Sequence, residues 1–491
     1  MKPDMIIVMT DQHAARVTGC YGDAIARTPN IDRLAREGVL FENTYCPSPL
    51  CLPSRMAFMT GRYPARTGCL TNRSVLPSDM PTFAHGLSLQ GYRTCLAGRM
   101  HFVGPDQLHG FDERLVGDIN SRLPFGDYPD LGPVGAAFGL APEPLANSGP
   151  GITTLQAFDR TVVDEATAWL KERVEERRAG HECVPFCLVV GLFLPHPPFV
   201  ATPESYDAFR DLVPPPALPV PQSPHPYMTE WMKCFDLSGV TADATRRSRT
   251  AYYGMVAETD RLVGEVVSIV DGNAEISDSV VVYTSDHGDQ LGERGLWGKS
   301  LMYETSTRVP LIMRQPKLMP ADVRRAQNVS LIDIGATLLD LAGAEPPPDT
   351  DGRSLLGIAR SPTAPWDNRI FSEFYGGMIG GDVPAMPVRM IRRDDWKLTW
   401  YGGYQPQLFD LSADPDETHD LADEPGAAKV RARLVDEVLA SWDPEEAERV
   451  LAEQKAREAY LRPWYRGRPD NDGPSWADNV HADNQLFPVV P

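Results

Sequence analysis

Four short apolar segments constrain the fold of this chain more than any other feature. They are each followed by polar residues and span Met5–Thr10, Tyr92–Ala97, Phe186–Leu194 and Val280–Ser285. Apolar segments of this length are typical of strands buried on both faces in a parallel sheet. Helical patterns are spread along the same part of the chain, at Thr28–Gly38, Thr161–Glu176, Thr250–Asp271 and Leu331–Ala344. The alternation predicts an α/β fold with a large, mostly parallel sheet flanked by helices.

The character of the sequence changes near Gly376. Beyond this point, hairpin strands are expected within Met390–Tyr401 and Gln407–Leu411, with charged helices at about 427–442 and 444–464. A polar tail from Arg466 follows, and we expect it to dock on a neighbouring subunit or along its own domain. These patterns divide the chain into a large domain, 1–375, and a smaller C-terminal α+β subdomain, 376–491.

Two irregular inserts interrupt the large domain, at about 122–151 and 203–240. Both are rich in proline, and long irregular segments within compact domains usually act as lids or binding loops. The first insert contains three aromatic residues, which can either pack or face a cationic ligand: Phe125, Tyr128 and Phe138.

Composition and charge exclude several classes of protein. The 491 residues carry a net charge of −20, which disfavours nucleic acid and other polyanions as partners. No apolar run reaches the roughly 18 residues of a membrane span, and the N-terminal segment lacks the features of a secretory signal peptide. The eight cysteines show no tight pairing pattern. We therefore expect reduced cysteines and a cytoplasmic protein.

Polar residues follow the apolar segments at the positions where open α/β sheets bind ligands. Asp11 and Gln12 follow the first segment, and Asp286 and His287 follow the fourth. Oxygen donors combined with one imidazole suit a hard or borderline divalent cation. The alternative is that both aspartates cap helices that follow them, and the spacing alone favours neither interpretation.

Three cations and two histidines also lie near the predicted strand ends: Arg55, Arg99, His101, His196 and Lys299. Together, such side chains can hold a tetrahedral oxyanion. The alternative for an isolated arginine or lysine is a surface salt bridge.

The segment Ser48–Tyr63 places Cys51 before a Pro-Ser pair that opens a predicted helix. Anions are favoured at a helix N-terminus, so a lowered thiol pKa and an anion site are expected, although a buried small side chain is also compatible. The full pattern, Cys51-Leu52-Pro53-Ser54-Arg55 with Thr-Gly-Arg-Tyr following, resembles the signature of type I, formylglycine-dependent sulfatases of the alkaline phosphatase superfamily. Further segments resemble the same family at 27–41, 285–310 and 407–420.

This resemblance implies a role for each candidate residue. One divalent cation, calcium or manganese, would be held by Asp11, Gln12, Cys51, Asp286 and His287. Cys51 would be converted to formylglycine by a maturation enzyme and act as the nucleophile, steadied by Arg55. The sulfate ester would be contacted by Arg99, His101, His196 and Lys299. The chain departs from the family pattern at one of these positions, because Arg99 stands where most sulfatases have a lysine.

Within the family, Leu96–Asp118 most resembles the choline sulfatase branch. The resemblance therefore implies hydrolysis of a sulfate monoester of a small alcohol or phenol, with choline sulfate and aryl sulfates as candidates. A phosphonate or phosphate ester hydrolase of the same superfamily is an alternative. A third possibility is an unmatured pseudo-enzyme that only binds anions. A homo-oligomer, dimer or tetramer, is expected.

Overall fold

The computed structural model describes residues 2–119, 145–181, 183–376, 386–466 and 485–488. Its centre is a nine-stranded sheet with the order β11-β2-β10-β8-β1-β6-β3-β4, in which β9 pairs with β2. The four predicted strands are confirmed: β1 (Met5–Thr10), β3 (Arg93–Gly98), β6 (Phe186–Gly191) and β8 (Val280–Ser285). All four are mutually parallel, whereas β10 (Leu311–Arg314) runs antiparallel to β8.

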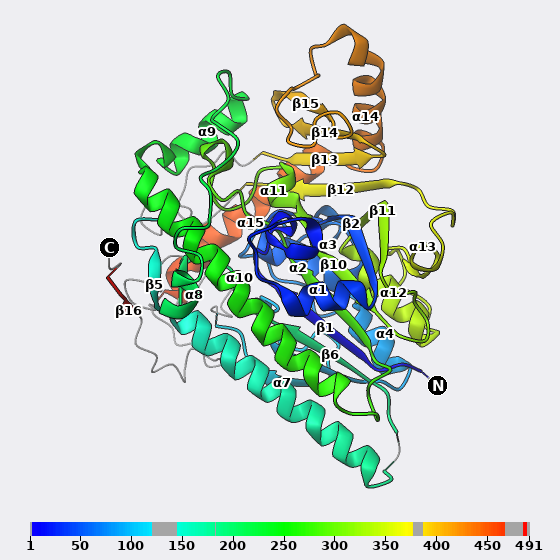
Figure 1. Ribbon diagram of the computed structural model, residues 1–491. Helices are drawn as coiled ribbons and strands as arrows, with labels where there is room; N and C mark the ends of the chain where they lie inside the picture. Colours follow the sequence, from blue (N-terminus) through cyan, green and yellow to red (C-terminus); the bar gives the residue numbers. More distant parts are fainter. Residues whose placement is uncertain (1, 120–144, 182, 377–385, 467–484, 489–491) are drawn as a thin grey trace.

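Strand β1 shows why the sheet is covered on both faces. Its side chains alternate between two hydrophobic cores, because successive residues of a strand point to opposite faces. Ile6 and Val8 pack in one core and Met5, Ile7 and Met9 in the other. The first core lies under the long helices α7 (Thr154–Arg178) and α10 (Ala242–Asp271), which run side by side across the lower part of Figure 1. The second lies under α2 (Cys51–Thr60), α4 (Phe83–Leu89) and α12 (Ile332–Ala342).

The C-terminal part forms a second sheet with the order β12-β13-β14-β15, drawn at the top of Figure 1. Its antiparallel strands are β12 (Arg369–Phe374), β13 (Val388–Arg393), β14 (Trp396–Tyr401) and β15 (Tyr404–Asp410). Helix α14 (Ala428–Ala440) packs on it, and α15 (Pro444–Tyr465) follows. Strand β12 precedes residue 376 and yet belongs to this sheet.

The remaining elements are shorter. The helices are α1 (Pro29–Arg36), α3 (Pro64–Thr67), α8 (Pro203–Asp207), α9 (Pro226–Cys234), α11 (Glu304–Thr307) and α13 (Leu356–Arg360). The strands are β2 (Val39–Tyr45), β4 (Glu113–Val116), β5 (Gly149–Ile152), β7 (Val200–Ala201), β9 (Arg308–Val309), β11 (Val323–Ser330) and β16 (Gln485–Leu486).

The inserts and the tail are described only in part. The second insert contains helices α8 and α9. Most of the first insert, including Phe125, Tyr128 and Phe138, lies outside the described residues. Within the tail, β16 pairs antiparallel with β5 of the same chain, as the own-domain alternative expects for these residues. Docking on a neighbouring subunit stays a prediction.

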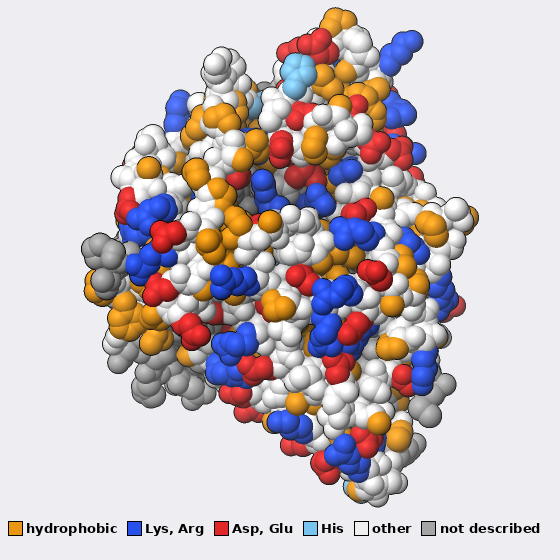
Figure 2. Space-filling model, in the orientation of Figure 1, with side chains coloured by type: hydrophobic (Ala, Val, Ile, Leu, Met, Phe, Trp, Pro, Cys, Tyr) orange, Lys and Arg blue, Asp and Glu red, His pale blue; other side chains and the backbone are white. Residues whose placement is uncertain are grey.

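Charged side chains of both signs share the surface, and the cysteines are in the thiol form. Figure 2 shows acidic and basic side chains interspersed over the visible face. All eight cysteines lie within the described residues, and none is paired in a disulfide. In the part of the chain that the structure describes, we find no helix with the length and apolar character needed to cross a membrane.

Candidate active site

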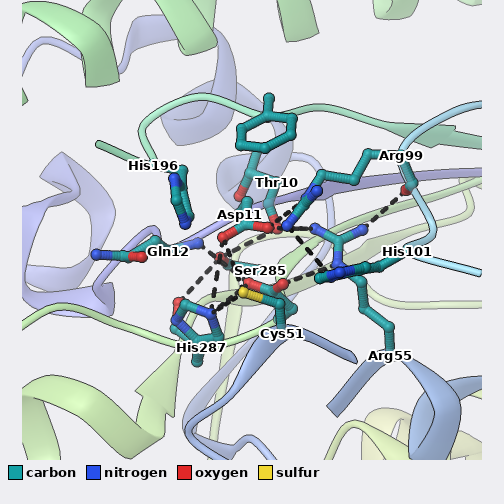
Figure 3. A network of polar contacts seen from close by, with 12 residues as sticks. Thr10, Asp11, Gln12, Cys51, Arg55, Arg99, His101, His196, Ser285 and His287 are labelled. Atoms are coloured by element: carbon teal, nitrogen blue, oxygen red, sulfur yellow. Dashed lines mark hydrogen bonds and ion pairs between the residues drawn. The ribbon is translucent and has the colours of Figure 1, made fainter. Parts of the chain in front are cut away.

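The carboxyl ends of the predicted parallel strands meet at one edge of the central sheet. Strand β1 lies between β6 and β8, and β3 pairs with the far side of β6. The residues that follow these strands therefore converge with the N-terminus of α2. Figure 3 shows the side chains from these ends pointing toward one another around Cys51.

Four of the predicted metal ligands form one buried cluster. One ligand atom from each of Asp11, Cys51, Asp286 and His287 lies within 4.8 Å of all the others. Neither aspartate caps a helix, because the next helical turns begin after Ala14 and Gly292, so the capping interpretation is wrong. The Nδ1 of His287 lies 3.0 Å from the carbonyl of Gly288, which can only accept, so a neutral His287 directs the lone pair of Nε2 at the cluster.

The two carboxylates of the cluster have opposite pKa shifts. Burial opposes ionisation of Asp11, but the nearby positive groups, Arg99 foremost and then His196 and Lys299, together outweigh it, and the pKa of Asp11 falls below its ordinary value. Burial raises the pKa of Asp286, and the neighbouring charge of Asp11 adds to the rise while Arg55 offsets part of it. Two carboxylates this close repel each other when both are ionised. A divalent cation removes that repulsion, so the donor set fits the metal ion that the resemblance implies.

Gln12 is oriented by a residue that the sequence analysis did not assign. Its Nε2 donates to the carboxylate of Asp289, and its Oε1 accepts from Lys299 Nζ at 2.7 Å. Because a carboxylate accepts and an ammonium donates, this network leaves the amide oxygen on the side of the site. Asp289 also accepts from the backbone N–H groups of Leu291 and Gly298. Burial raises the pKa of Asp289 to about 6.

Cys51 is the first residue of α2 and is almost completely buried. Its Sγ lies 3.1 Å from Lys299 Nζ and 3.2 Å from His287 Nε2. Burial by itself would raise the thiol pKa, but the charges of Lys299 and His287 outweigh it, and the pKa of Cys51 lies well below its ordinary value. The surroundings of Cys51 therefore favour an anionic side chain, as expected at this helix N-terminus, and the interpretation of Cys51 as an inert buried side chain is not supported.

Arg55 lies one turn along α2 from Cys51 and links the helix to the carboxylates of both predicted metal ligands, Asp11 and Asp286. Its Nε donates to Asp286 at 2.8 Å, and its Nη2 lies 3.3 Å from Asp11. Its Nη1 donates to the carbonyl of Arg99 at 2.8 Å. The guanidinium is fully buried, so a surface salt bridge is excluded for this residue. Arg55 positions the carboxylates and, through α2, Cys51.

The side chain of Arg99 is directed toward two carboxylates, whereas the family resemblance implied a contact with the sulfate ester. Its Nε donates to Asp11, its Nη1 lies 3.6 Å from Asp118, and its guanidinium lies 3.9 Å from the ring centre of Phe193. Arg99 is buried, so the surface interpretation is excluded here too. Within the described residues, Nη1 has no hydrogen-bond partner. Nη1, although ion-paired with Asp118, therefore makes no hydrogen bond to the described residues that would compete with an anion, while Nε is committed to Asp11.

The two candidate histidines differ in tautomer. His101 Nδ1 lies 3.4 Å from Arg99 Nη2, a group that can only donate, so the proton of a neutral His101 is on Nε2. His196 Nδ1 lies 2.6 Å from the carbonyl of Pro197, which can only accept, so a neutral His196 carries its proton on Nδ1. Burial and the charge of Lys299 lower the pKa of His196 to about 4. At neutral pH, His101 therefore presents a donor and His196 an acceptor.

Two further carboxylates hold these histidines in place. Asp118 accepts from the backbone N–H of His101 at 2.6 Å, where the backbone has a φ of 63°. Asp159 on α7 accepts from the N–H groups of Phe193 and Leu194, directly before His196. Neither aspartate is predictable from the sequence alone, because their partners lie in other segments. For Asp118, a local signal in the sequence is its place in the segment Leu96–Asp118, which resembles the choline sulfatase branch.

Comparison with known proteins identifies the family to which this chain belongs. Residues 3–344 match the model of the Sulfatase family, and residues 292–443 match the model described as N-sulphoglucosamine sulphohydrolase, C-terminal. A choline-sulfatase of Rhizobium meliloti is 36% identical over 479 residues, covering 93% of this chain and 90% of that protein. Arylsulfatase K of Xenopus laevis is 31% identical, covering 86% and 79%.

Solved structures show the same fold. A phosphonate monoester hydrolase of Agrobacterium radiobacter has a TM-score of 0.74 at 22% identity, covering 92% of this chain and 96% of its own. A protein solved in complex with D-glucosamine-2-N,6-O-disulfate has a TM-score of 0.70 at 22% identity, covering 96% and 100%. At this identity the comparison supports the architecture alone.

Proposed function

Because the chain belongs to the sulfatase family and is a sulfuric ester hydrolase, we propose that it hydrolyses sulfate monoesters of small alcohols or phenols, with choline sulfate as the first candidate. The proposal includes conversion of Cys51 to formylglycine and one divalent cation, calcium or manganese. The observation that carries it is the buried cluster of Asp11, Asp286 and His287 around the Cys51 thiol at the N-terminus of α2.

The cation would be held by Asp11, Gln12, Asp286 and His287, next to the modified side chain of Cys51. A bound divalent cation supplies Lewis acidity and lowers the pKa of a hydroxyl beside it, and a hydrated formylglycine supplies that hydroxyl. The protein's part is to hold these groups without further reorganisation. Arg55 does so by bonding to Asp11 and Asp286 from the same helix that carries Cys51.

Negative charge on the sulfuryl group is met by cations that are already in place. Lys299 Nζ lies 3.1 Å from Cys51 Sγ, and Nη1 of Arg99, 3.6 Å from Asp118, makes no hydrogen bond within the described residues. Donors fixed in a buried site stabilise a developing anion more than mobile water does. Lys299 and Arg99 therefore bind and orient the sulfuryl oxygens.

The leaving alcohol needs a proton, and His101 is the better donor. Its Nε2 carries a proton in the neutral tautomer that Arg99 imposes, whereas the neutral His196 offers a lone pair at Nε2. The low pKa of His196 keeps it neutral at pH 7. We assign proton donation to His101. We assign to His196 the orientation of the nucleophilic side chain at position 51, because interaction with Cys51 also affects the pKa of His196.

Choline sulfate is favoured among the small esters by the relatives. The choline-sulfatase of Rhizobium meliloti covers 93% of this chain, and Arylsulfatase K of Xenopus laevis covers 86%. The net charge of −20 suits an ester with a cationic tail better than a polysulfated polymer. Aryl sulfates remain the second candidate substrates.

A parallel assay tests this proposal. Choline sulfate, p-nitrophenyl sulfate and phenylphosphonate monoesters are compared with protein made alongside a formylglycine-generating enzyme, and the Cys51 peptide is analysed by mass spectrometry. Turnover of sulfate esters with formylglycine at position 51 supports the proposal. Preferential turnover of the phosphonate would support the alternative hydrolase, and a bound cation with thiol at position 51 and no turnover would support an anion-binding pseudo-enzyme.

The matched variant is Cys51→Ala, which should abolish turnover and leave the protein folded. Activity retained in Cys51→Ala would show that another residue is the nucleophile. We further propose a cytoplasmic location and a homo-oligomeric state, dimer or tetramer. The absence of disulfides among the eight cysteines agrees with a reducing compartment.

A further inference from the structure

The segment 407–420, which resembles the sulfatase family in sequence, lies against the loop that carries Lys299. Strand β15 leads into a turn containing Asp416 and Glu417, and β14 carries Lys397. Glu417 is buried, although it belongs to a turn rich in charged residues, and its backbone has a φ of 52°. The mechanism above uses neither this turn nor Lys397.

Lys397 joins two carboxylates of different parts of the chain. Its Nζ lies 2.9 Å from Glu304 at the start of α11 and 2.8 Å from Glu417. The side chain of Lys397 is 1% exposed and that of Glu417 is 2% exposed. Glu304 also accepts from the hydroxyl of Tyr45 at 3.0 Å, on β2 of the central sheet. Removing one member of such a buried network leaves an uncompensated charge, so the ion pairs of Lys397 with Glu304 and Glu417 depend on each other.

The turn holds both ends of the Lys299 loop. Glu417 accepts from the backbone N–H of Glu304 at 2.8 Å, five residues after Lys299. The neighbouring carbonyl of Asp416 accepts from Arg294, five residues before Lys299. The guanidinium of Arg294 also lies 4.2 Å from the ring centre of Tyr303 within the loop. Two adjacent residues of the C-terminal subdomain thus bind the two flanks of one catalytic loop.

The loop needs external support because its own backbone is irregular. Ser300, directly after Lys299, has a φ of 79°, a left-handed conformation that costs energy for a residue with a side chain. At the same time, Lys299 Nζ must lie within reach of both Gln12 Oε1 and Cys51 Sγ. A displacement of about 1 Å from such a geometry can reduce a reaction rate by about 100-fold.

We propose that Lys397 and Glu417 are positioning residues for Lys299, so that the C-terminal subdomain sets the geometry of the sulfuryl-binding lysine. The role of Lys299 itself rests on the proposed function. Lys397 and Glu417 act through the backbone of the loop, from Arg294 to Glu304, and their ion pairs and hydrogen bonds go to residues other than the predicted cation ligands.

A double-mutant cycle with Lys299→Ala tests the coupling. In the wild-type background, Lys397→Met and Glu417→Gln should each lower kcat/KM by about 100-fold, as misplacement of a catalytic group predicts. In the Lys299→Ala background, the same substitutions should change kcat/KM by less than about twofold, because their target is already gone. Independent, multiplicative losses in the two backgrounds would overturn the proposal. Lys397→Arg, which keeps the charge, should restore part of the activity.

A matched control separates positioning from stability. Arg389→Met breaks another buried ion pair of the same sheet, Arg389–Glu373 at 3.2 Å, away from the Lys299 loop. It should lower the free energy of unfolding but keep kcat/KM per folded molecule. If Lys397→Met does not fold, Arg294→Gln tests the other flank of the loop, with the same two outcomes in the cycle.

A crystal structure of Glu417→Gln gives a readout that does not depend on turnover. The expected result is that Lys299 Nζ no longer lies within hydrogen-bond distance of Gln12 Oε1. An unchanged Lys299 position would overturn the inference even in an active enzyme. A wild-type protein that hydrolyses no ester would instead defeat the proposed function, while the crystallographic comparison still decides the inference.

Discussion

Arg99 and Asp11 form a buried ion pair at the point where β1 and β3 end, and this pair decides how much of Arg99 remains for substrate. The Nε of Arg99 donates to Asp11 Oδ2, while Nη1 lies 3.6 Å from Asp118 and makes no hydrogen bond among the described residues. A lysine has a single terminal ammonium and cannot divide its donors in this directed way. We therefore expect Arg99 to combine two tasks, holding the carboxylate of a predicted metal ligand and meeting an anion.

This division predicts different effects for two substitutions of Arg99. Arg99→Lys keeps one charge, so kcat/KM should fall by about tenfold, the equivalent of about 1.4 kcal/mol for a lost directed hydrogen bond. Arg99→Met leaves Asp11 and Asp118 without this cation, and breaking such a buried pair costs about 3–5 kcal/mol of stability. Steady-state kinetics and chemical denaturation measure the two effects. Equal stability of the two variants would contradict the role of Arg99 in holding Asp11.

Removal of the cation should lower both activity and stability. A chelator should abolish turnover. It should also lower the Tm, because the folded protein loses a ligand. The free energy of unfolding falls by about 2.7 kcal/mol if the ion was present at 100 times its Kd. Asp286→Asn should be inactive and its Tm insensitive to the chelator. Asp333→Asn is the control, since Asp333 is equally buried but bonds to Ser330 and Arg353 away from the cluster. If the chelator left the Tm of Asp333→Asn unchanged, the assignment of the cation to the cluster that contains Asp286 would be contradicted.

The two histidines should be distinguishable by the leaving group. His101→Asn should slow hydrolysis of choline sulfate by about 10²–10⁴-fold, because an alkoxide needs a proton from a general acid. The same variant should affect p-nitrophenyl sulfate much less, since p-nitrophenolate leaves readily without one. His196→Asn should slow both esters by similar factors. A larger leaving-group effect for His196→Asn would move the proton donor from His101 to His196.

Asp159 should make stability depend on pH. Burial raises its folded-state pKa to about 7 from an ordinary 3.8, against the opposing hydrogen bonds from Leu194 and Phe193. The folded state therefore holds the proton more tightly, so this contribution to stability is complete below about pH 4 and is lost as the pH rises to about 7. Asp159→Asn should remove this slope, up to about 1.4 kcal/mol per pH unit, and leave an offset independent of pH. Denaturant unfolding between pH 4.5 and 8 measures the difference; parallel curves would contradict the shifted pKa.

The sequence by itself was enough to predict the four parallel strands β1, β3, β6 and β8 of the nine-stranded sheet, and the polar residues that follow them. Apolar runs revealed β1, β3, β6 and β8 because buried parallel strands need apolar side chains on both faces. The positions of Asp11, Asp286 and His287 at the strand ends then followed from the α/β architecture. The helix-opening motif at Cys51 marked the anion site, because the N-terminal dipole is a local property of the chain.

Only the tertiary structure decided which polar groups pair. Asp289 with Gln12, Asp118 with His101, and Lys397 with Glu304 join residues far apart in the sequence. No local pattern encodes such a pair, because the partners depend on sheet order and on the paths of irregular loops. The orientation of Arg99 toward Asp11 has the same origin: a buried guanidinium takes its direction from the carboxylates that the fold brings around it.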